Sequence, residues 1–224
     1  MSKKKQTAAI EAFRQLRSKY NLSPAEFRYV CKMVRELDGL QIPKGRKSLP
    51  DFLNPAEIYH LLDISKEAHF DNLLIESLIK TGLRIQEANN LLVSDLDFGA
   101  NQLKVRQGKG SKDRYVPMAH SLQRRLLTFL NGRTSGYVFC KPDGRKYSKR
   151  MLQLKVTKWL EKAAFSKKLS THSLRHTFAC ACLARRVPIE KVKDLMGHSD
   201  IKVTQIYAKL ETGAFKDDFL RLME

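Results

Sequence analysis

One stretch decides both the fold and the candidate site of this chain, residues 170–210: STHSLRHTFACACLARRVPIEKVKDLMGHSDIKVTQIYAKL. Thr171 suits the start of a helix, because its hydroxyl can accept an unpaired backbone N–H of the first turn. The predicted helix carries His172 and Arg175 one turn apart, with His176 beside them. The stretch therefore predicts a helix that presents an imidazole and a guanidinium together.

A second helix is predicted in the same stretch. Pro188 suits its first turn and Gly197 suits its end, so His198 falls just beyond a helix terminus. Tyr207 follows within another helical pattern. Phosphate ligands and a candidate nucleophile thus lie close together in the sequence.

Composition narrows the class of partner. The chain has 224 residues, of which 42% are hydrophobic, enough for one substantial core with a small appendage. Its 42 Lys and Arg against 23 Asp and Glu give a net charge of +19, which favours a long polyanion over a small acidic metabolite. Nucleic acid is the leading partner, but other basic proteins share this balance, so the motifs must decide.

The cysteines and the apolar segments indicate a cytoplasmic protein. No paired C-x-x-C spacing is present, so we expect four reduced thiols, at Cys31, Cys140, Cys180 and Cys182. No apolar run is long enough for a membrane span, and Met1 is followed by lysines rather than by a signal sequence. We therefore expect a location at the nucleoid and no membrane partner.

The hydrophobic pattern predicts four parts. Helices over 7–19 and 23–37 form a helical hairpin in region 1–40, and a basic linker at 41–50 holds Lys44, Arg46 and Lys47. The main domain, 51–212, begins with the helix start Asn54-Pro55-Ala56-Glu57. A tail helix at 213–224 carries an apolar stripe of Phe215, Phe219 and Leu222.

Within the main domain, the pattern predicts a mainly α fold with a small three-stranded antiparallel sheet, an α+β class. A very apolar helix over 66–80 is expected at the centre of the core. The period falls to two between 94 and 118, which indicates the three strands. Further helices are predicted over 84–92, 120–130 and 148–164.

The residue types suit attack on a phosphodiester. A phenol with a pKa near 10 needs a neighbouring base or cations before Tyr207 can act as a nucleophile. Arg84 and Arg175 are the candidate pair for the phosphate oxygens, because planar guanidiniums match those oxygens better than lysines. Lys109 or Lys112, in a glycine-containing turn, is the candidate proton donor to the departing oxygen.

Two metal sites are weaker alternatives. His172, His176 and Cys180 have a spacing that places three zinc ligands on one helix face, yet His176 is better interpreted as a core histidine. Asp95 and Asp97 lie at strand spacing, without the further acids that a two-metal nuclease needs. The chain also lacks a G-x-x-x-x-G-K-[ST] loop, so neither a metal nor ATP is expected as a cofactor.

Several motifs together resemble the tyrosine recombinase (phage integrase) family, over about Leu53 to Leu210. They are Thr81-Gly82-Leu83-Arg84 with Glu87, Gly108-Lys109-Gly110, His172-x-x-Arg175, Gly197-His198 and Tyr207. The resemblance implies that five groups surround the scissile phosphate: Arg84, Lys109, His172, Arg175 and His198. It also implies that Tyr207 attacks the phosphate, that Glu87 supports the site, and that Lys109 fits the family lysine better than Lys112.

The resemblance further implies a reaction and its partners. The family forms a 3′-phosphotyrosine linkage, frees a 5′ hydroxyl and needs no cofactor, and four protomers exchange strands on two sites of double-stranded DNA. We therefore expect a homotetramer on DNA, with a monomer as the alternative off DNA, and DNA-bending or directionality proteins as accessory partners. Further DNA contacts are expected from five basic residues, Lys112, Arg114, Lys44, Arg46 and Lys47.

Some alternatives stay open at the level of the sequence. The family has a large N-terminal clamp domain, so the shorter hairpin at 1–40 is either a reduced clamp or depends on a partner for site recognition. The tail helix docks either on a neighbouring protomer or on its own core. A DNA-binding regulator that does not cut, and a type IB topoisomerase, are the other functional interpretations.

Overall fold

The computed structural model describes residues 3–38, 50–106 and 113–197, in two units that span 1–48 and 49–224. Each unit is described by itself. The first is a pair of helices, α1 (Lys3–Lys19) and α2 (Pro24–Leu37), in which the rings of Phe13 and Phe27 meet edge to face at 5.9 Å. Ser23 caps α2 and exchanges hydrogen bonds with Glu26.

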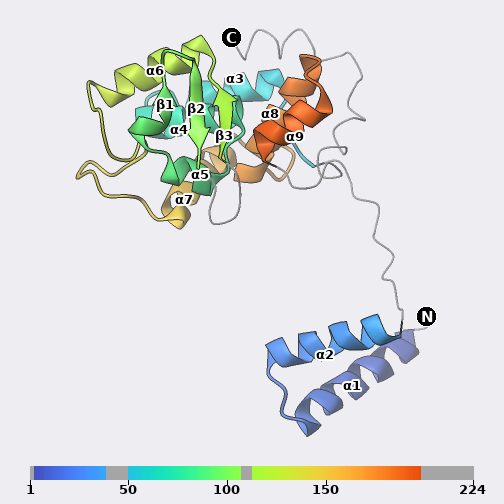
Figure 1. Ribbon diagram of the computed structural model, residues 1–224. Helices are drawn as coiled ribbons and strands as arrows, with labels where there is room; N and C mark the ends of the chain where they lie inside the picture. The colour runs from blue at the N-terminus through green and yellow to red at the C-terminus, as the bar shows by residue number, and fades with distance from the viewer. Residues whose placement is uncertain (1–2, 39–49, 107–112, 198–224) are drawn as a thin grey trace. The chain divides into compact units, whose positions relative to one another are not determined.

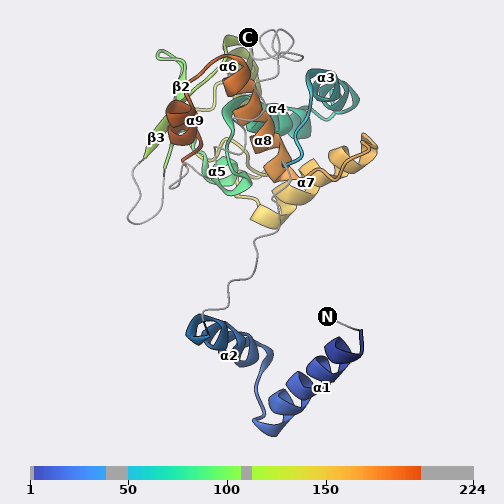
Figure 2. The same ribbon diagram turned by 90° about the vertical axis from the view of Figure 1, so that its right-hand side faces the viewer.

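The second unit is helical with one small sheet (Figures 1 and 2), as predicted. Among its described residues the helices are α3 (Pro55–Ile64), α4 (His69–Thr81), α5 (Ile85–Asn90), α6 (His120–Leu130), α7 (Lys149–Lys162), α8 (Thr171–Ala184) and α9 (Ile189–Met196). A 3-10 turn, η1 (Val93–Asp95), leads into strands β1 (Leu96–Asp97), β2 (Gln102–Val105) and β3 (Arg114–Pro117). The sheet is antiparallel in the order β1-β2-β3.

Several predicted helix starts were wrong by one to four residues, and the largest error is at α1, which begins at 3 instead of 7. Ser170, not Thr171, is the cap of α8, and its N–H donates to the Ser173 hydroxyl at 3.1 Å, while Thr171 is buried in the first turn. Pro188 caps α9 rather than beginning it. The core helix begins at 69 instead of 66, because residues 65–68 form a turn after α3. The start of α3 is as predicted, with Asn54 and Glu57 capping each other.

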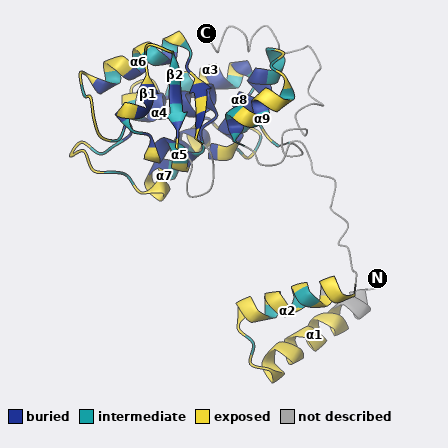
Figure 3. Cartoon of the chain, in the orientation of Figure 1, coloured by how far each residue is buried: buried dark blue, intermediate teal, exposed yellow. Residues whose placement is uncertain are grey.

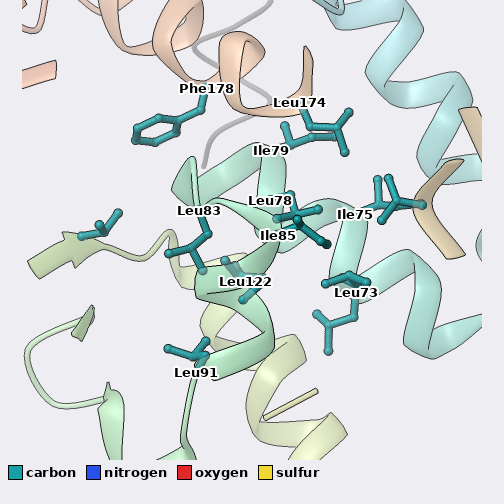
Figure 4. Close-up of a cluster of buried hydrophobic side chains, with 14 of the residues drawn as sticks. Leu73, Ile75, Leu78, Ile79, Leu83, Ile85, Leu91, Leu122, Leu174 and Phe178 are labelled. Atoms are coloured by element: carbon teal, nitrogen blue, oxygen red, sulfur yellow. The ribbon is translucent and has the colours of Figure 1, made fainter. Parts of the chain in front are cut away.

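Helix α4 is the centre of the unit, as its apolar sequence predicts. Every residue from Asp71 to Thr81 is buried, and the helix contacts α3, α5, α6, α7 and α8 (Figure 3). Leu174 and Phe178 of α8 lie beside the α4 side chains in the hydrophobic cluster of Figure 4. Burial of each of these large side chains contributes about 2 kcal/mol, so α8 is held firmly against the core.

Buried polar groups on α4 have partners from the surrounding helices. Asp71 accepts hydrogen bonds from Trp159 Nε1 at 2.9 Å and from Lys155 Nζ at 3.0 Å, both on α7. Glu76 pairs with Lys80 at 3.2 Å and with Arg125 of α6. Because a buried charge without a partner is costly, these pairs specify which faces of α6 and α7 meet α4.

A tight turn connects α4 to α5 and positions the first site residues. Gly82 ends α4 in the left-handed region, at φ +63°. A Cβ at Gly82 would lie 2.3 Å from Cδ1 of Phe178, so only glycine lets α8 pack this closely. The turn is therefore fixed both by its backbone conformation and by a ring of α8.

We predict that Gly82→Ala lowers the free energy of unfolding by roughly 2–4 kcal/mol, from left-handed strain and overpacking together. Gly132→Ala is the matched control, because Gly132 has φ +79° with nothing within 4 Å, and its expected cost is about 1 kcal/mol. Urea unfolding followed by the single tryptophan, Trp159, measures both. Equal losses of stability in the two variants would contradict the proposed clash with Phe178.

Candidate active site

Arg84 lies directly after the Gly82 turn and precedes α5. Its backbone N–H donates to Glu87 Oε2 at 2.7 Å, so Glu87 caps the first turn of the helix on which it lies. The Arg84 guanidinium bonds the other oxygen, Oε1, at 2.8 Å. Arg84 and Glu87 therefore form an i,i+3 ion pair, and Arg84 keeps 38% of its side chain exposed.

Helix α8 contributes both Arg175 and His172. Arg175 is only 3% exposed and donates to the carbonyl of Gly82 and to that of Met196. Its Nη1 also lies 3.6 Å from Glu87 Oε2. His172, one turn earlier, is exposed. The α8 helix thus brings a buried guanidinium and an exposed imidazole to the same site.

Glu87 is the shared partner of three arginines. Besides Arg84 and Arg175, it accepts two hydrogen bonds from Arg114 at the start of β3, from Nη1 at 3.0 Å and Nη2 at 2.8 Å. The Glu87 side chain is 13% exposed. Three guanidiniums against one carboxylate leave a surplus of two positive charges, so the cluster favours an anion.

The C-terminal end of α9 is the second shared partner. Three consecutive carbonyls, those of Leu195, Met196 and Gly197, accept hydrogen bonds from Arg114 (2.7 Å), Arg175 and Arg84 (3.2 Å) respectively. The last carbonyls of a helix have no partner within the helix and carry partial negative charge. The arginines therefore supply both hydrogen bonds and compensating charge to this end, and residue 198 follows it directly.

Within the cluster, the pKa values of Glu87 and of His172 are both lowered. Burial raises the pKa of the Glu87 carboxyl, but the hydrogen bonds and charge of Arg114, with help from Arg84 and Arg175, hold it below its ordinary value. The pKa of His172 is lowered by desolvation and then by the charges of Arg175, Arg84 and Lys149. Glu87 is therefore ionised at pH 7, and the His172 imidazole is neutral and able to accept a proton.

The structure brings together four of the residues expected from the sequence: Arg84, Glu87, His172 and Arg175. The others lie outside the described residues, namely Lys109, Lys112, His198, Tyr207, Lys44, Arg46 and Lys47, with Phe215, Phe219 and Leu222 of the tail. Arg114 needs correction. It was expected to contact DNA, but it is 9% exposed and its guanidinium points to Glu87 and to the Leu195 carbonyl.

The sequence assigned one contributor, Arg114, to another role and missed a second, Lys149. Arg114 shares the buried face of β3 with Val116, and an arginine at an inward strand position signals a buried acidic partner. Lys149, in the first turn of α7, is exposed and close enough to lower the pKa of His172. Its sequence context gave no signal, because α7 meets the site only through the tertiary fold.

The metal alternatives find no support in the part of the chain that the structure describes. No group of three His, Cys, Asp or Glu residues is arranged there as a metal site. Cys180 is buried, and burial raises the pKa of its thiol to about 12. Asp95 instead accepts from Arg106 at 2.6 Å, and Asp97 accepts from the Ala100 N–H at 2.9 Å.

The sequence also predicted reduced cysteines and no membrane span. All four cysteines are free thiols. None of the described helices is both long and apolar enough to cross a membrane.

The chain is similar to known proteins over most of its second unit. The model of the phage integrase family matches residues 51–213. A tyrosine recombinase of Pseudothermotoga lettingae is 35% identical over 173 residues, 76% of this chain and 60% of the relative. The tyrosine recombinase XerA of Pyrococcus furiosus is 33% identical over 187 residues, 81% of this chain and 65% of the relative. The chain thus spans about three fifths of the length of these relatives.

Solved structures agree with this similarity. The crystal structure of XerA recombinase superposes with a TM-score of 0.67 at 25% identity, covering 96% of this chain and 82% of that one. The structure of XerH site-specific recombinase bound to a palindromic difH substrate, a post-cleavage complex, gives 0.65 at 23% identity, covering 80% and 55%. The second likeness concerns the fold alone.

We predict that His176 makes the stability of the second unit depend on pH. Burial, then the charges of His172 and Arg175, lower the pKa of His176 to about 4, whereas an unfolded histidine titrates near 6.5. Between these values the unfolded chain binds more protons, so the free energy of unfolding falls as the pH drops from about 7 to about 4. Urea unfolding at several pH values should show a smaller fall in His176→Asn. His120→Asn, at an exposed site, is the control, and an equal slope in all three proteins would refute the prediction.

Proposed function

The chain belongs to the phage integrase family, and we propose that it is a site-specific recombinase that cuts and rejoins double-stranded DNA through Tyr207. The observation that carries this proposal is the convergence of Arg84 and Arg175 on Glu87 and the end of α9, with His172 close enough to both arginines that, besides desolvation, their charges lower its pKa. Such a cluster suits a phosphodiester better than a carboxylic acid, because it offers planar donor forks on more than one side.

The two arginines act on the phosphate oxygens. As the Tyr207 oxygen attacks phosphorus, negative charge builds on the two non-bridging oxygens, and donors already in place stabilise that charge without reorganisation. We assign these two oxygens to Arg84, which is partly exposed, and to Arg175, which is fixed by two backbone carbonyls. His198 is proposed to donate a further hydrogen bond.

Proton transfers complete the step. A neutral His172 accepts the phenolic proton of Tyr207, which its lowered pKa permits at pH 7. The Tyr207 oxygen forms a bond to phosphorus, the bond from phosphorus to the 5′ oxygen breaks, and Lys109 protonates that oxygen, with Lys112 as the alternative donor. A 3′-phosphotyrosine and a 5′ hydroxyl result. The ester keeps the energy of the broken bond, so the reverse attack by a 5′ hydroxyl joins strands without ATP or a metal.

The rest of the chain is assigned around this reaction. We assign 51–212 to the catalytic domain, 1–40 to a DNA-facing helical hairpin, 41–50 to a basic linker and 213–224 to a tail that contacts a neighbouring protomer. Lys44, Arg46 and Lys47 of the linker are proposed phosphate contacts. The assembly that exchanges strands is a homotetramer on two DNA sites, which acts at the nucleoid in the cytoplasm.

Tyr207→Phe should abolish covalent attachment to DNA, because phenylalanine has no oxygen to attack phosphorus. The protein is incubated with a pool of nicked duplexes of randomised sequence, denatured, and assayed for DNA that stays attached. Tyr115→Phe is the matched control, since Tyr115 is an exposed tyrosine of β3. An adduct that survives in Tyr207→Phe would place the nucleophile elsewhere. No adduct in the wild type would favour a regulator that does not cut.

Sequencing the trapped DNA supplies the site for a second assay. Two copies of that site on one supercoiled plasmid should give recombinant products. Relaxation without recombinants would instead support the type IB topoisomerase interpretation.

DNA affinity should fall steeply with salt, because each phosphate contact releases counterions. We expect affinity to fall about 10³-fold or more between 50 and 200 mM salt, measured by fluorescence anisotropy with the recovered site. Replacing Lys44, Arg46 and Lys47 by glutamine should reduce the slope of log Kd against log salt by about one for each lysine or arginine that binds a phosphate. An unchanged slope would remove the linker from the interface, and a flat response in the wild type would contradict a basic DNA-binding surface.

A further inference from the structure

Arg114 lies where three elements of the second unit meet. Arg114 is the first residue of β3, lies on the buried face of the strand and is 9% exposed. Its Nη1 and Nη2 bond both oxygens of Glu87, while its Nε donates to the Leu195 carbonyl at 2.7 Å. One side chain therefore links β3, α5 and the end of α9.

Glu87 is oriented by two residues: Arg84, whose backbone N–H donates to Oε2 and whose guanidinium donates to Oε1, and Arg114, whose fork bonds both oxygens. A carboxylate held at both oxygens by one planar fork has a fixed plane, whereas a contact to one oxygen allows it to turn. Arg84 reaches Glu87 with its side chain at Oε1 alone. With Arg114 in place, Glu87 presents Oε1 to Arg84 in one direction, and the partly exposed guanidinium of Arg84 is aimed accordingly.

The contact to α9 acts on the other side of the site. Arg114, Arg175 and Arg84 bond the carbonyls of three successive residues that end at Gly197. Arg114 holds the first of them from a buried position in the sheet. It thereby fixes the helix end against which both phosphate-binding arginines are arranged.

We propose that Arg114 is a positioning residue, which orients Arg84 through Glu87 and anchors the end of α9 while remaining out of contact with DNA. This inference rests on the proposed function and extends it to a residue with no direct part in the chemistry. Its signature is a reduced cleavage rate at unchanged DNA affinity, because a buried guanidinium adds little to binding, whereas small misplacement of catalytic groups is costly.

The test compares Arg114→Met and Arg114→Lys with Arg125→Met. Arg125 is the matched control, since it also pairs with a buried carboxylate, Glu76, but on α4 and α6. Single-turnover attachment of Tyr207 to its nicked site is measured at saturating DNA, below the thermal transition of every variant, and Kd is measured separately. We expect Arg114→Met to lower the rate about 100-fold with Kd within about twofold of the wild type.

Partial rescue distinguishes positioning from the simple removal of a charge. Arg114→Lys keeps the charge but lacks the fork, so we expect the rate to fall about tenfold. Combining Arg114→Met with Glu87→Gln should lower the rate little more than the more damaging single change, because both substitutions break one linkage. Rates of Arg114→Met equal to those of Arg125→Met, or a tenfold or greater weakening of DNA binding, would overturn the proposal.

An independent readout separates this proposal from the proposed function. In arginine side-chain NMR spectra of the free protein, Arg114→Lys should speed hydrogen exchange of the Arg84 guanidinium, and Arg125→Met should leave it unchanged. If the wild type forms no adduct, the proposed function fails whatever these spectra show. If the wild type does form an adduct but Arg84 is unaffected by Arg114→Lys, the positioning role alone is refuted.

Discussion

The site depends on one carboxylate. Arg84, Arg114 and Arg175 come from three different elements, and their positive charges would repel one another without Glu87 between them. Glu87 alone does not neutralise the group, so the cluster keeps a net positive charge while it stays assembled. A site for a phosphate needs both a net positive charge and a stable arrangement of its arginines. Glu87, a single acidic side chain in the first turn of α5, allows both.

The core explains why these elements meet. Helix α4 is buried on all sides, and its end at Gly82 places Arg84 and α5 next to α8. The same Gly82 carbonyl accepts a hydrogen bond from Arg175, and its Cα faces the ring of Phe178. The turn at Gly82 therefore both packs against Phe178 and holds Arg175, so the geometry of the site follows from the packing of α8 on α4.

The sequence predicted those features of the fold that depend on interactions between residues close together in the chain. The apolar run of α4 and the cap of α3 could be predicted from the sequence, because each is set within a few residues. Arg114 was misassigned to DNA contact, because its partners are 27 and 81 residues away along the chain. Only the tertiary fold shows that its inward strand position faces Glu87 and not solvent.

The three carbonyls at the end of α9 have a consequence for solvation. Guanidinium groups that point into a protein lose their hydrogen bonds to water and need other acceptors. Here the three backbone carbonyl oxygens are those acceptors. Arg114 and Arg175 stay nearly dry on these oxygens, whereas the Arg84 side chain is 38% exposed and keeps part of its surface in solvent. The helix end therefore holds all three arginines in place before any ligand arrives, and water is displaced mainly from Arg84 when a ligand binds.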